Sequence, residues 1–189
     1  IVGYGQIGQL VCRYARAFDA AVLVVDPFVE ADAVRAAGAE KVAYDDMLAR
    51  SDFVTFHVPL TDETRNMINA DRLKRMKNGV VILNFAREGI VDAAAVCAGI
   101  DAGKIYSYVC DFPGRELKSR KRVIALPHLG ASTDEAEENC AVMVADQVRD
   151  YLENGNIFNA VNFPEVHMPR TEGYRIAIAN ANVPNMVGQ

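Results

Sequence analysis

The sequence predicts an α/β fold built on a doubly wound parallel sheet. Short apolar segments rich in β-branched residues alternate with segments of helical periodicity along most of the chain. Such alternation is typical of a parallel sheet that helices cover on both faces. Segments 21–26 and 79–84 are almost entirely apolar, as strands buried on both faces are expected to be.

The expected elements follow one another in a regular order. The expected strands are apolar runs, and in chain order they lie at 1–2, 21–26, 41–43, 52–58, 79–84, 104–110 and 123–126. The expected helices have apolar residues at helical spacing, and they lie at 6–18, 32–37, 44–50, 71–76, 92–102 and 133–153. Gly38 ends the second helix and Pro59 stops the fourth strand. Residues 1–2 have the character of the end of a strand.

The helix expected at 133–153 has clear signals at both ends. Ser132 and Glu135 form a capping-box pattern at its start, and Gly155 is a stop signal. Residues 156–173 contain two prolines and little periodicity, which predicts a linker. Residues 174–179 then alternate as a strand does, which predicts the start of another domain.

Composition restricts the classes of protein to consider. With 51% hydrophobic and 24% charged residues, the 189-residue chain is typical of one globular domain with a short extra segment. A net charge of -5 argues against nucleic acid as a partner, and no apolar run approaches the roughly 20 residues of a membrane span. The cysteines form no CxxC pair, which predicts reduced thiols in a cytoplasmic protein and no metal site.

A glycine motif lies between the first strand and the first helix. Gly3, Gly5 and Gly8 match G-x-G-x-x-G, whose glycines allow a tight turn, the approach of a pyrophosphate and close packing of the helix on the strand. Asp26 ends the next strand, where a carboxylate accepts bonds from ribose hydroxyls and repels a 2′-phosphate. The sequence therefore predicts a Rossmann-type NAD-binding domain over residues 1–155. A glycine-rich turn that binds nothing is the alternative.

Polar residues follow three later strands, at the edge where an open parallel sheet binds its ligand. Hydride exchange between nicotinamide and a hydroxy acid requires a carboxylate anchor, a general base and a carboxylate that orients the base. Arg87, His128 and Glu116 have the chemical types for these three roles. A solvated arginine and a histidine in a capped turn are the alternatives. His57 is expected to end a strand beside the cofactor without catalysing.

The segments around these residues resemble those of a known family. NFAREGIVD (84–92), VCDFPGRE (109–116), PHLGASTDEAEEN (127–139) and HVPLTDETRNMI (57–68) are similar to sequence blocks of the D-isomer-specific 2-hydroxyacid dehydrogenases. The resemblance runs from Gly3 to about Glu153. It implies that Arg87 binds the substrate carboxylate, that His128 is the acid/base, and that Glu116 pairs with His128.

The resemblance also implies a set of NAD contacts. Pyrophosphate, ribose, adenine and nicotinamide contacts are distributed along the loops that follow successive strands. The implied cofactor residues are Gly3, Gly5, Gln6, Ile7, Gly8, Asp26, Val58, Pro59, Thr64, Phe85, Ala86, Arg87, Asp111, His128 and Gly130.

The end of the chain resembles one branch of that family. AVNFP (160–164) is similar to the same segment in members that oxidise 3-phosphoglycerate in serine biosynthesis. Those members continue into a regulatory ACT domain, and residues 174–189 resemble the beginning of that domain. The resemblance implies a small-molecule substrate and a homodimer or homotetramer. Two alternatives remain: another D-2-hydroxyacid dehydrogenase, such as a glycerate or hydroxypyruvate reductase, and an NAD-sensing, corepressor-like scaffold.

Several features depart from the family pattern. Glu88 occupies a position that is often glycine, the usual Asp-Val-Phe is replaced at 111–113, and the stretch from Glu116 to His128 is brief. The 189 residues include neither the substrate-binding segment that normally precedes the glycine loop nor most of the ACT domain. We therefore expect this chain alone to bind NAD weakly and to turn over poorly or not at all.

Overall fold

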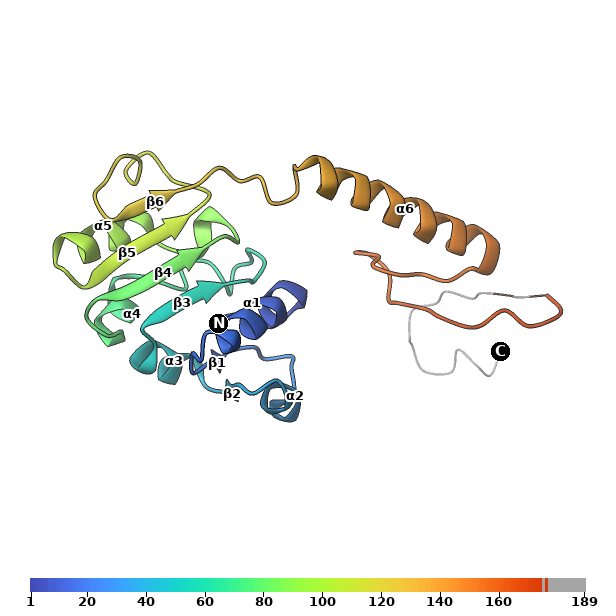
Figure 1. The fold of residues 1–189 in the computed structure, drawn as a ribbon, viewed down its shortest axis with the longest axis horizontal. Helices are drawn as coiled ribbons and strands as arrows, with labels where there is room; N and C mark the ends of the chain where they lie inside the picture. Colours follow the sequence, from blue (N-terminus) through green and yellow to red (C-terminus); the bar gives the residue numbers. More distant parts are fainter. Residues whose placement is uncertain (175, 177–189) are drawn as a thin grey trace. The chain divides into compact units, whose positions relative to one another are not determined.

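The computed structural model describes residues 1–174 and residue 176. The chain divides into two compact units, Ile1–His128 and Leu129–Gln189, which Figure 1 draws and which are described separately below. The strand expected at 174–179 and the domain expected to begin at 174 lie outside the described residues, apart from Tyr174 and Ile176. The domain boundary at residue 155 stays a prediction.

The first unit contains a four-stranded parallel sheet with the order β3-β4-β5-β6. Its strands lie side by side in Figure 1 and are β3 (Phe53–Phe56), β4 (Val80–Asn84), β5 (Ile105–Cys110) and β6 (Val123–Ala125). A parallel pair is formed by β1 (Leu23–Val24) and β2 (Glu40–Lys41). Val2 makes parallel bridges to both Val25 and Phe56 and so links the pair to the larger sheet. The predicted parallel α/β architecture is confirmed.

The expected helices of this unit are present, with ends that differ by a residue or so. They are α1 (Gln6–Ala17), α2 (Ala31–Ala36), α3 (Tyr44–Arg50), α4 (Ala70–Arg75) and α5 (Ala93–Asp101), and a short 3-10 helix, η1, spans Glu88–Ile90. Side chains cap two of them: Asn69 accepts from the amide of Arg72, and Asp92 accepts from Ala94 and Ala95. These caps satisfy amides that the first turn of a helix leaves without partners.

The buried side chains of the first unit form two clusters. The larger cluster joins β3, β4 and β5 to α3, α4 and α5, with Phe56, Met47, Leu48 and Ile82 fully buried. The smaller one joins β1 to α1 and α2 around Val24. Burial of this kind contributes roughly 25 cal/mol per Å² of apolar surface, so the core fixes the strand ends that carry the polar loops.

Helix α1 buries a different face from the one its apolar residues suggest. Gly8 and Cys12 are its buried residues, and Val11 is half-buried. Ile7 and Tyr14 lie at helical spacing and would be expected to share a buried face, but they are 64% and 58% exposed. Small residues allow a helix to approach the sheet closely, so here the contact face is set by size as well as by hydrophobicity.

The second unit contains one long helix, α6 (Asp134–Asn154). Its N-cap is Thr133, whose hydroxyl accepts from the amide of Ala136, so the predicted cap at Ser132 is wrong by one residue. Gly155 ends the helix in the left-handed region at φ 70°, as predicted. Within Asp134–Asn154 the structure buries no residue. Among the described residues, no helix has both the length and the apolar character needed to cross a membrane.

Candidate functional site

The polar loops of the first unit meet at the carboxyl ends of its parallel strands. Val2 lies between Val25 and Phe56, so the chain leaves the middle of the sheet at Gly3. On one side of Val2 the strands continue to β1 and β2, and on the other side to β3 and its neighbours. Strand order reverses at this point, which is where doubly wound sheets bind their ligands.

Two glycines of the loop exclude side chains by packing. Gly3 has φ +90°, and a Cβ there would lie 2.5 Å from the carbonyl oxygen of His57. A Cβ on Gly8 would lie 2.1 Å from the carbonyl oxygen of Gly3. The first contact brings the loop against the end of β3, and the second brings α1 against the loop. Any larger residue at either position would push these elements apart.

The middle glycine faces open space instead. No described atom lies within 4 Å of the position that a Cβ on Gly5 would take, and α1 begins at the next residue, Gln6. Gln6 and Ile7 are exposed in the first turn. A helix start with free amides and room in front of it suits a phosphate group. The loop therefore fits a pyrophosphate by shape and by charge.

Asp26 is held rigidly beside this loop. Its Oδ2 accepts from the amide of Tyr4 at 2.7 Å, and its Oδ1 accepts from the amide of Phe28 at 2.8 Å. The carboxylate thus directly follows the residues of β1 and bonds to the middle of the glycine loop. Its remaining acceptor positions suit ribose hydroxyl groups.

The loop after β3 packs against the glycine loop. A Cγ of Val58 lies 2.8 Å from where a Cβ on Gly3 would be, so these two loops touch. The hydroxyl of Thr64 donates to the carbonyl of Pro59 at 2.6 Å and ties the next turn to this loop. Three of the predicted cofactor residues, Val58, Pro59 and Thr64, are thus brought to the glycine loop or linked to it.

His57 is part of the same junction. Its amide donates to the carbonyl of Val2 at 2.7 Å, and its Nε2 lies 3.0 Å from the hydroxyl of Thr55. Burial, with a smaller contribution from the positive amino terminus, lowers the pKa of His57 to about 4. A histidine that stays neutral at ordinary pH and bonds to its own strand fits the expectation of a strand end without an acid/base role.

The buried side-chain amide of Asn84 bonds to the backbone of the loop after β4. Asn84 is 1% exposed; its Nδ2 donates to the carbonyl of Arg87 at 2.9 Å, and its Oδ1 accepts from the amide of Ala86 at 3.2 Å. The same Nδ2 lies 3.4 Å from the hydroxyl of Tyr108 on β5, whose pKa burial raises. Sequence reasoning did not assign Asn84 a role, although a polar residue closing the apolar run 79–84 is a usable signal.

His128 follows β6 and bonds to a carboxylate. Its Nδ1 lies 2.7 Å from Oδ2 of Asp111, at the end of β5. The side chain of Asp111 is 11% exposed, and its Oδ1 has no partner among the described residues. Because Nδ1 is bonded to Asp111, Nε2 is the nitrogen left for proton exchange, and the imidazole is 42% exposed. A buried acceptor without a donor suits the amide of a bound ligand.

The structure differs from the sequence expectation in the carboxylate it places on His128. That carboxylate belongs to Asp111, whereas Glu116 lies in the loop beyond β5. The sulfur of Cys97 lies 3.8 Å from the carbonyl of Glu116, and the next residue, Leu117, is buried. These contacts fix the backbone of Glu116 against α5, while Asp111 reaches the imidazole directly from its strand.

The carboxylate of Glu116 lies beside that of Glu88. Oε1 of Glu88 is 3.0 Å, and Oε2 of Glu116 is 3.9 Å, from the position that a Cβ on Gly114 would take. Gly114 therefore leaves room for the Glu88 carboxylate, while Glu116 would be at an ordinary contact distance. Glu88 replaces the glycine that is usual at this position of the segment 84–92, so this departure from the family pattern lies at the candidate site.

Phe112 contacts both Arg87, in the loop after β4, and His128. Its ring centroid is 4.1 Å from that of His128, with the planes tilted by 34°, and the guanidinium carbon of Arg87 is 5.9 Å from the same centroid. Arg87, Asp111 and His128 are thus brought together, as their positions at strand ends predicted. The contact made by Phe112 was not predicted, because it depends on the path of the loop.

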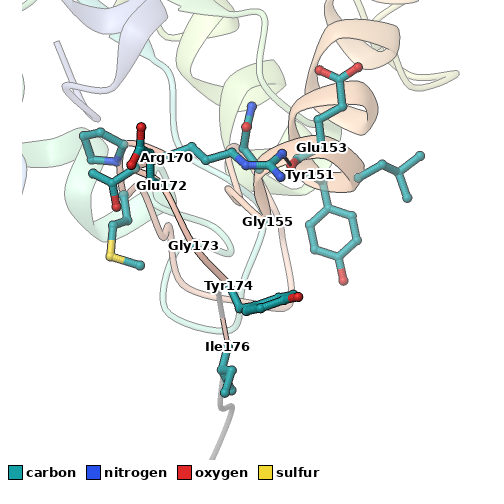
Figure 2. A pocket seen from close by; sticks show the side chains of 13 residues that line it. Tyr151, Glu153, Gly155, Arg170, Glu172, Gly173, Tyr174 and Ile176 are labelled. Carbon is teal, nitrogen blue, oxygen red and sulfur yellow. Dashed lines mark hydrogen bonds between the residues drawn. The ribbon is translucent and has the colours of Figure 1, made fainter.

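The remaining predicted residues are placed less closely. Phe85 is partly exposed at the start of the arginine loop, and Gly130 belongs to the second unit. That unit has a cavity of about 450 Å³ between the end of α6 and residues 168–174 and 176, where Arg170 donates to the carbonyl of Glu153 (Figure 2). None of the described residues that line it belongs to the predicted site.

A family model matches the part of the chain that carries this geometry. Residues 1–130 match the model described as D-isomer specific 2-hydroxyacid dehydrogenase, NAD binding domain. The match covers the glycine loop, the loops after β3 to β5, and His128.

Individual relatives agree at the level of sequence. The D-3-phosphoglycerate dehydrogenase of Synechocystis sp. is 39% identical over 170 residues, which are 87% of this chain and 31% of the relative. That of Archaeoglobus fulgidus is 35% identical over 173 residues, 88% of this chain and 33% of the relative. The chain thus spans about a third of the length of these curated relatives.

Solved structures agree at the level of the fold. A glyoxylate reductase from Paecilomyes thermophila has a TM-score of 0.77 at 30% identity, covering 85% of this chain and 51% of that one. The D-lactate dehydrogenase of Aquifex aeolicus, solved with NAD and lactic acid, has a TM-score of 0.71 at 28% identity and covers 80% and 52%. These neighbours share the fold but differ in the acids that they are named for.

Proposed function

Because the chain belongs to the D-isomer specific 2-hydroxyacid dehydrogenases and is an NAD-binding domain of that family, we propose that it serves the NAD-dependent oxidation of a D-2-hydroxy acid. The observation that carries the proposal is the meeting of Arg87 and His128 on Phe112 at the carboxyl ends of β4 to β6. An anchor for a carboxylate and a group for proton transfer are the two elements that this oxidation needs beside the cofactor.

The residues present fit the cofactor. Gly5 leaves space at the start of α1 for the pyrophosphate, Asp26 offers acceptors for the ribose, and Oδ1 of Asp111 awaits a donor. Val58, Pro59 and Thr64 would border the adenine side of the site. When bound, NAD would supply the two-electron redox chemistry at the substrate carbon.

The chain's own residues would orient the substrate and move its proton. Arg87 would bind the carboxylate with its guanidinium, which is suited to bidentate contacts. Asp111 holds Nδ1 of His128 at 2.7 Å, which leaves Nε2 to take the proton of the substrate hydroxyl. Asp111 and Glu116 would both stabilise the imidazolium that results, Asp111 by its direct bond.

For the substrate we propose 3-phosphoglycerate, with 3-phosphohydroxypyruvate as product, in serine biosynthesis. The support is the name of the sequence relatives, at 35% to 39% identity over most of this chain. A second candidate, another small D-2-hydroxy acid, is favoured by the solved neighbours named for glyoxylate and lactate. Since the chain spans about a third of its curated relatives, the substrate assignment depends on likeness in the cofactor half.

Two further features belong to the proposal. We propose a cytoplasmic protein, since all four cysteines are free in the described part of the chain. We also propose a homodimer or homotetramer, since the exposed apolar side chains of Leu10 and Tyr14 on α1 would be covered by a partner.

The test uses cofactor binding and a substrate panel. We expect the chain to bind NADH more tightly than NADPH, measured by nucleotide fluorescence, because Asp26 repels a 2′-phosphate. NADH formation should be slow, fastest with 3-phosphoglycerate among it, D-glycerate and D-lactate, and absent in His128→Ala. Faster turnover of lactate would favour the second candidate, and failure to bind NADH would contradict the proposal.

A further inference from the structure

We propose that Phe112 is a positioning residue, whose ring sets the imidazole of His128 and the guanidinium of Arg87 relative to each other. The inference rests on the proposed function and deepens it. Neither the family blocks nor the spacing of residues gave the phenyl ring of Phe112 a role. It concerns geometry that can be measured without turnover, so it can be tested separately from the proposed function.

The contact with His128 is close. Aromatic pairs in proteins have centroid separations of about 4.5 to 7 Å, and this pair, at 4.1 Å with a tilt of 34°, is slightly closer than that range. The residue before Phe112 is Asp111, which bonds to Nδ1 of the same imidazole. Two consecutive residues of one loop therefore hold the imidazole, one through a ring nitrogen and the other through the ring itself. A half-turn of the imidazole about its χ2 angle would break the bond to Asp111, and a quarter-turn would also break the ring contact with Phe112.

The contact with Arg87 joins the second loop to the first. The guanidinium carbon lies 5.9 Å from the phenyl centroid, within the range of about 6 Å for a cation on an aromatic ring. The only other contact described for this guanidinium is a bond from Nη1 to the carbonyl of Ala86, within its own loop, at 2.7 Å. In the described part of the chain no bond joins Arg87 to His128 directly. Phe112 is therefore the contact through which the spacing of anchor and base is set.

The chemistry of the step favours an aromatic residue at this position. When His128 takes a proton it becomes a second cation beside Arg87, and two like charges repel. The face of a phenyl ring attracts cations, so Phe112 would offset part of that repulsion while keeping the two groups apart. Leucine would fill similar space without such a face. Tyrosine would keep it.

The first measurement detects the contact itself. The chain has three histidines, so labelling of imidazole carbons gives three NMR signals, each assigned from a single His→Gln variant. In Phe112→Leu we expect the His128 signal to move and to broaden, with those of His57 and His167 unchanged. In Phe112→Tyr it should stay close to its original position.

A matched control is available in the second unit. Phe158 pairs with His167 at 5.4 Å and a tilt of 42°, so Phe158→Leu removes the same kind of contact from a histidine outside the site. This variant should move only the His167 signal. Thermal unfolding of each variant shows whether the fold is kept, and if Phe112→Leu does not fold, the milder Phe112→Met replaces it in the same comparison.

The second measurement follows turnover. Loss of the aromatic contact should lower kcat about threefold to tenfold in Phe112→Leu, with rescue in Phe112→Tyr and unchanged kcat in Phe158→Leu. A His128 signal that does not respond to Phe112→Leu would overturn the inference, as would equal kcat in wild type and Phe112→Leu. If the wild type has no turnover, NADH binding remains the test of the proposed function, and the NMR response alone decides whether Phe112 positions the imidazole.

Discussion

Asp111 and Glu116 occupy different places around His128, so their contributions can be separated by substitution. Asp111→Asn keeps the shape of the side chain but removes the charge that holds Nδ1 at 2.7 Å. We expect it to lower kcat/KM by about 100-fold or more, since a misoriented acid/base group loses most of its effect. Glu116→Gln should cost about tenfold or less. Steady-state kinetics on both variants would contradict this ranking if the Glu116 variant were the weaker enzyme.

Asn84 offers a second test at the scale of one residue. Asn84→Leu removes the donor to the carbonyl of Arg87 and the acceptor for the amide of Ala86. Leaving buried polar groups without partners should lower the free energy of unfolding by about 1 to 3 kcal/mol and raise KM for the hydroxy acid. Tyr108→Phe is the control, because it removes only the 3.4 Å contact. Urea titrations give the stabilities, and equal losses in the two variants would contradict the role given to Asn84.

His57 predicts a pH dependence of stability. Burial lowers its pKa from 6.5 to about 4. Between pH 6.5 and pH 4, His57 is therefore protonated in the unfolded chain and neutral in the folded chain. The contribution of His57 is therefore fully present above about pH 6.5 and is lost as the pH falls toward 4. His57→Asn should reduce the slope of unfolding free energy against pH in this window. Identical slopes in urea unfolding of wild type and variant would contradict the prediction.

Residues of recognisable chemical type at strand ends could be predicted, and residues that act through packing could not. Arg87 and His128 each follow an apolar run, so their position at one edge of the sheet follows from the parallel order. Phe112 contacts both only because of the path its loop takes. The pairing of His128 with Asp111 depends on the same local path, which the sequence does not specify.

At the scale of elements, the glycine loop and α1 form one packed unit. Gly8→Ala should lower the free energy of unfolding by about 2 kcal/mol or more, because its Cβ would meet the carbonyl oxygen of Gly3 at 2.1 Å. Gly5→Ala should change stability by about 1 kcal/mol or less, since no described atom lies within 4 Å, yet weaken NADH binding. Thermal melts and nucleotide fluorescence check this pair. A Gly5 variant that binds NADH normally would argue against the assigned phosphate position.

Helices and strands were predicted to within a few residues, while their contact faces and caps were less accessible. Ser132 and Thr133 are both good caps, and only the geometry of the turn selects Thr133. In α1 the apolar stripe at Ile7 and Tyr14 predicts a helix but not the buried face, which Gly8 and Cys12 occupy. Close approach of backbones favours small residues, a preference that periodicity does not register.

At the scale of the whole molecule, almost all of the described core lies in the first unit. The buried hydrophobic residues lie between Ile1 and Leu117, and α6 contributes none. A chain ended after Ser132 should therefore keep a cooperative thermal transition within a few degrees of the original, with loss of helical circular dichroism. Loss of cooperativity in the shortened chain would show that residues beyond Ser132 support the sheet.

Alternation of strands and helices predicted a parallel sheet, but not the order of its strands. That order follows from Val2, which bridges both Val25 and Phe56 and so divides the sheet at the glycine loop. The sequence does not indicate that a single residue, Val2, pairs with two strands. The glycine loop, Asp26 and the loop after β3 nevertheless lie at this division of the sheet.

The two bonds that hold Asp26 have a consequence for protein engineering. A neutral or basic residue in its place is the usual first step in redesigning an enzyme of this kind for NADP. Here that change would also remove the acceptor of the Tyr4 amide and loosen the loop that is proposed to bind the pyrophosphate. A useful redesign would have to add a new acceptor for that amide together with a cation for the extra phosphate.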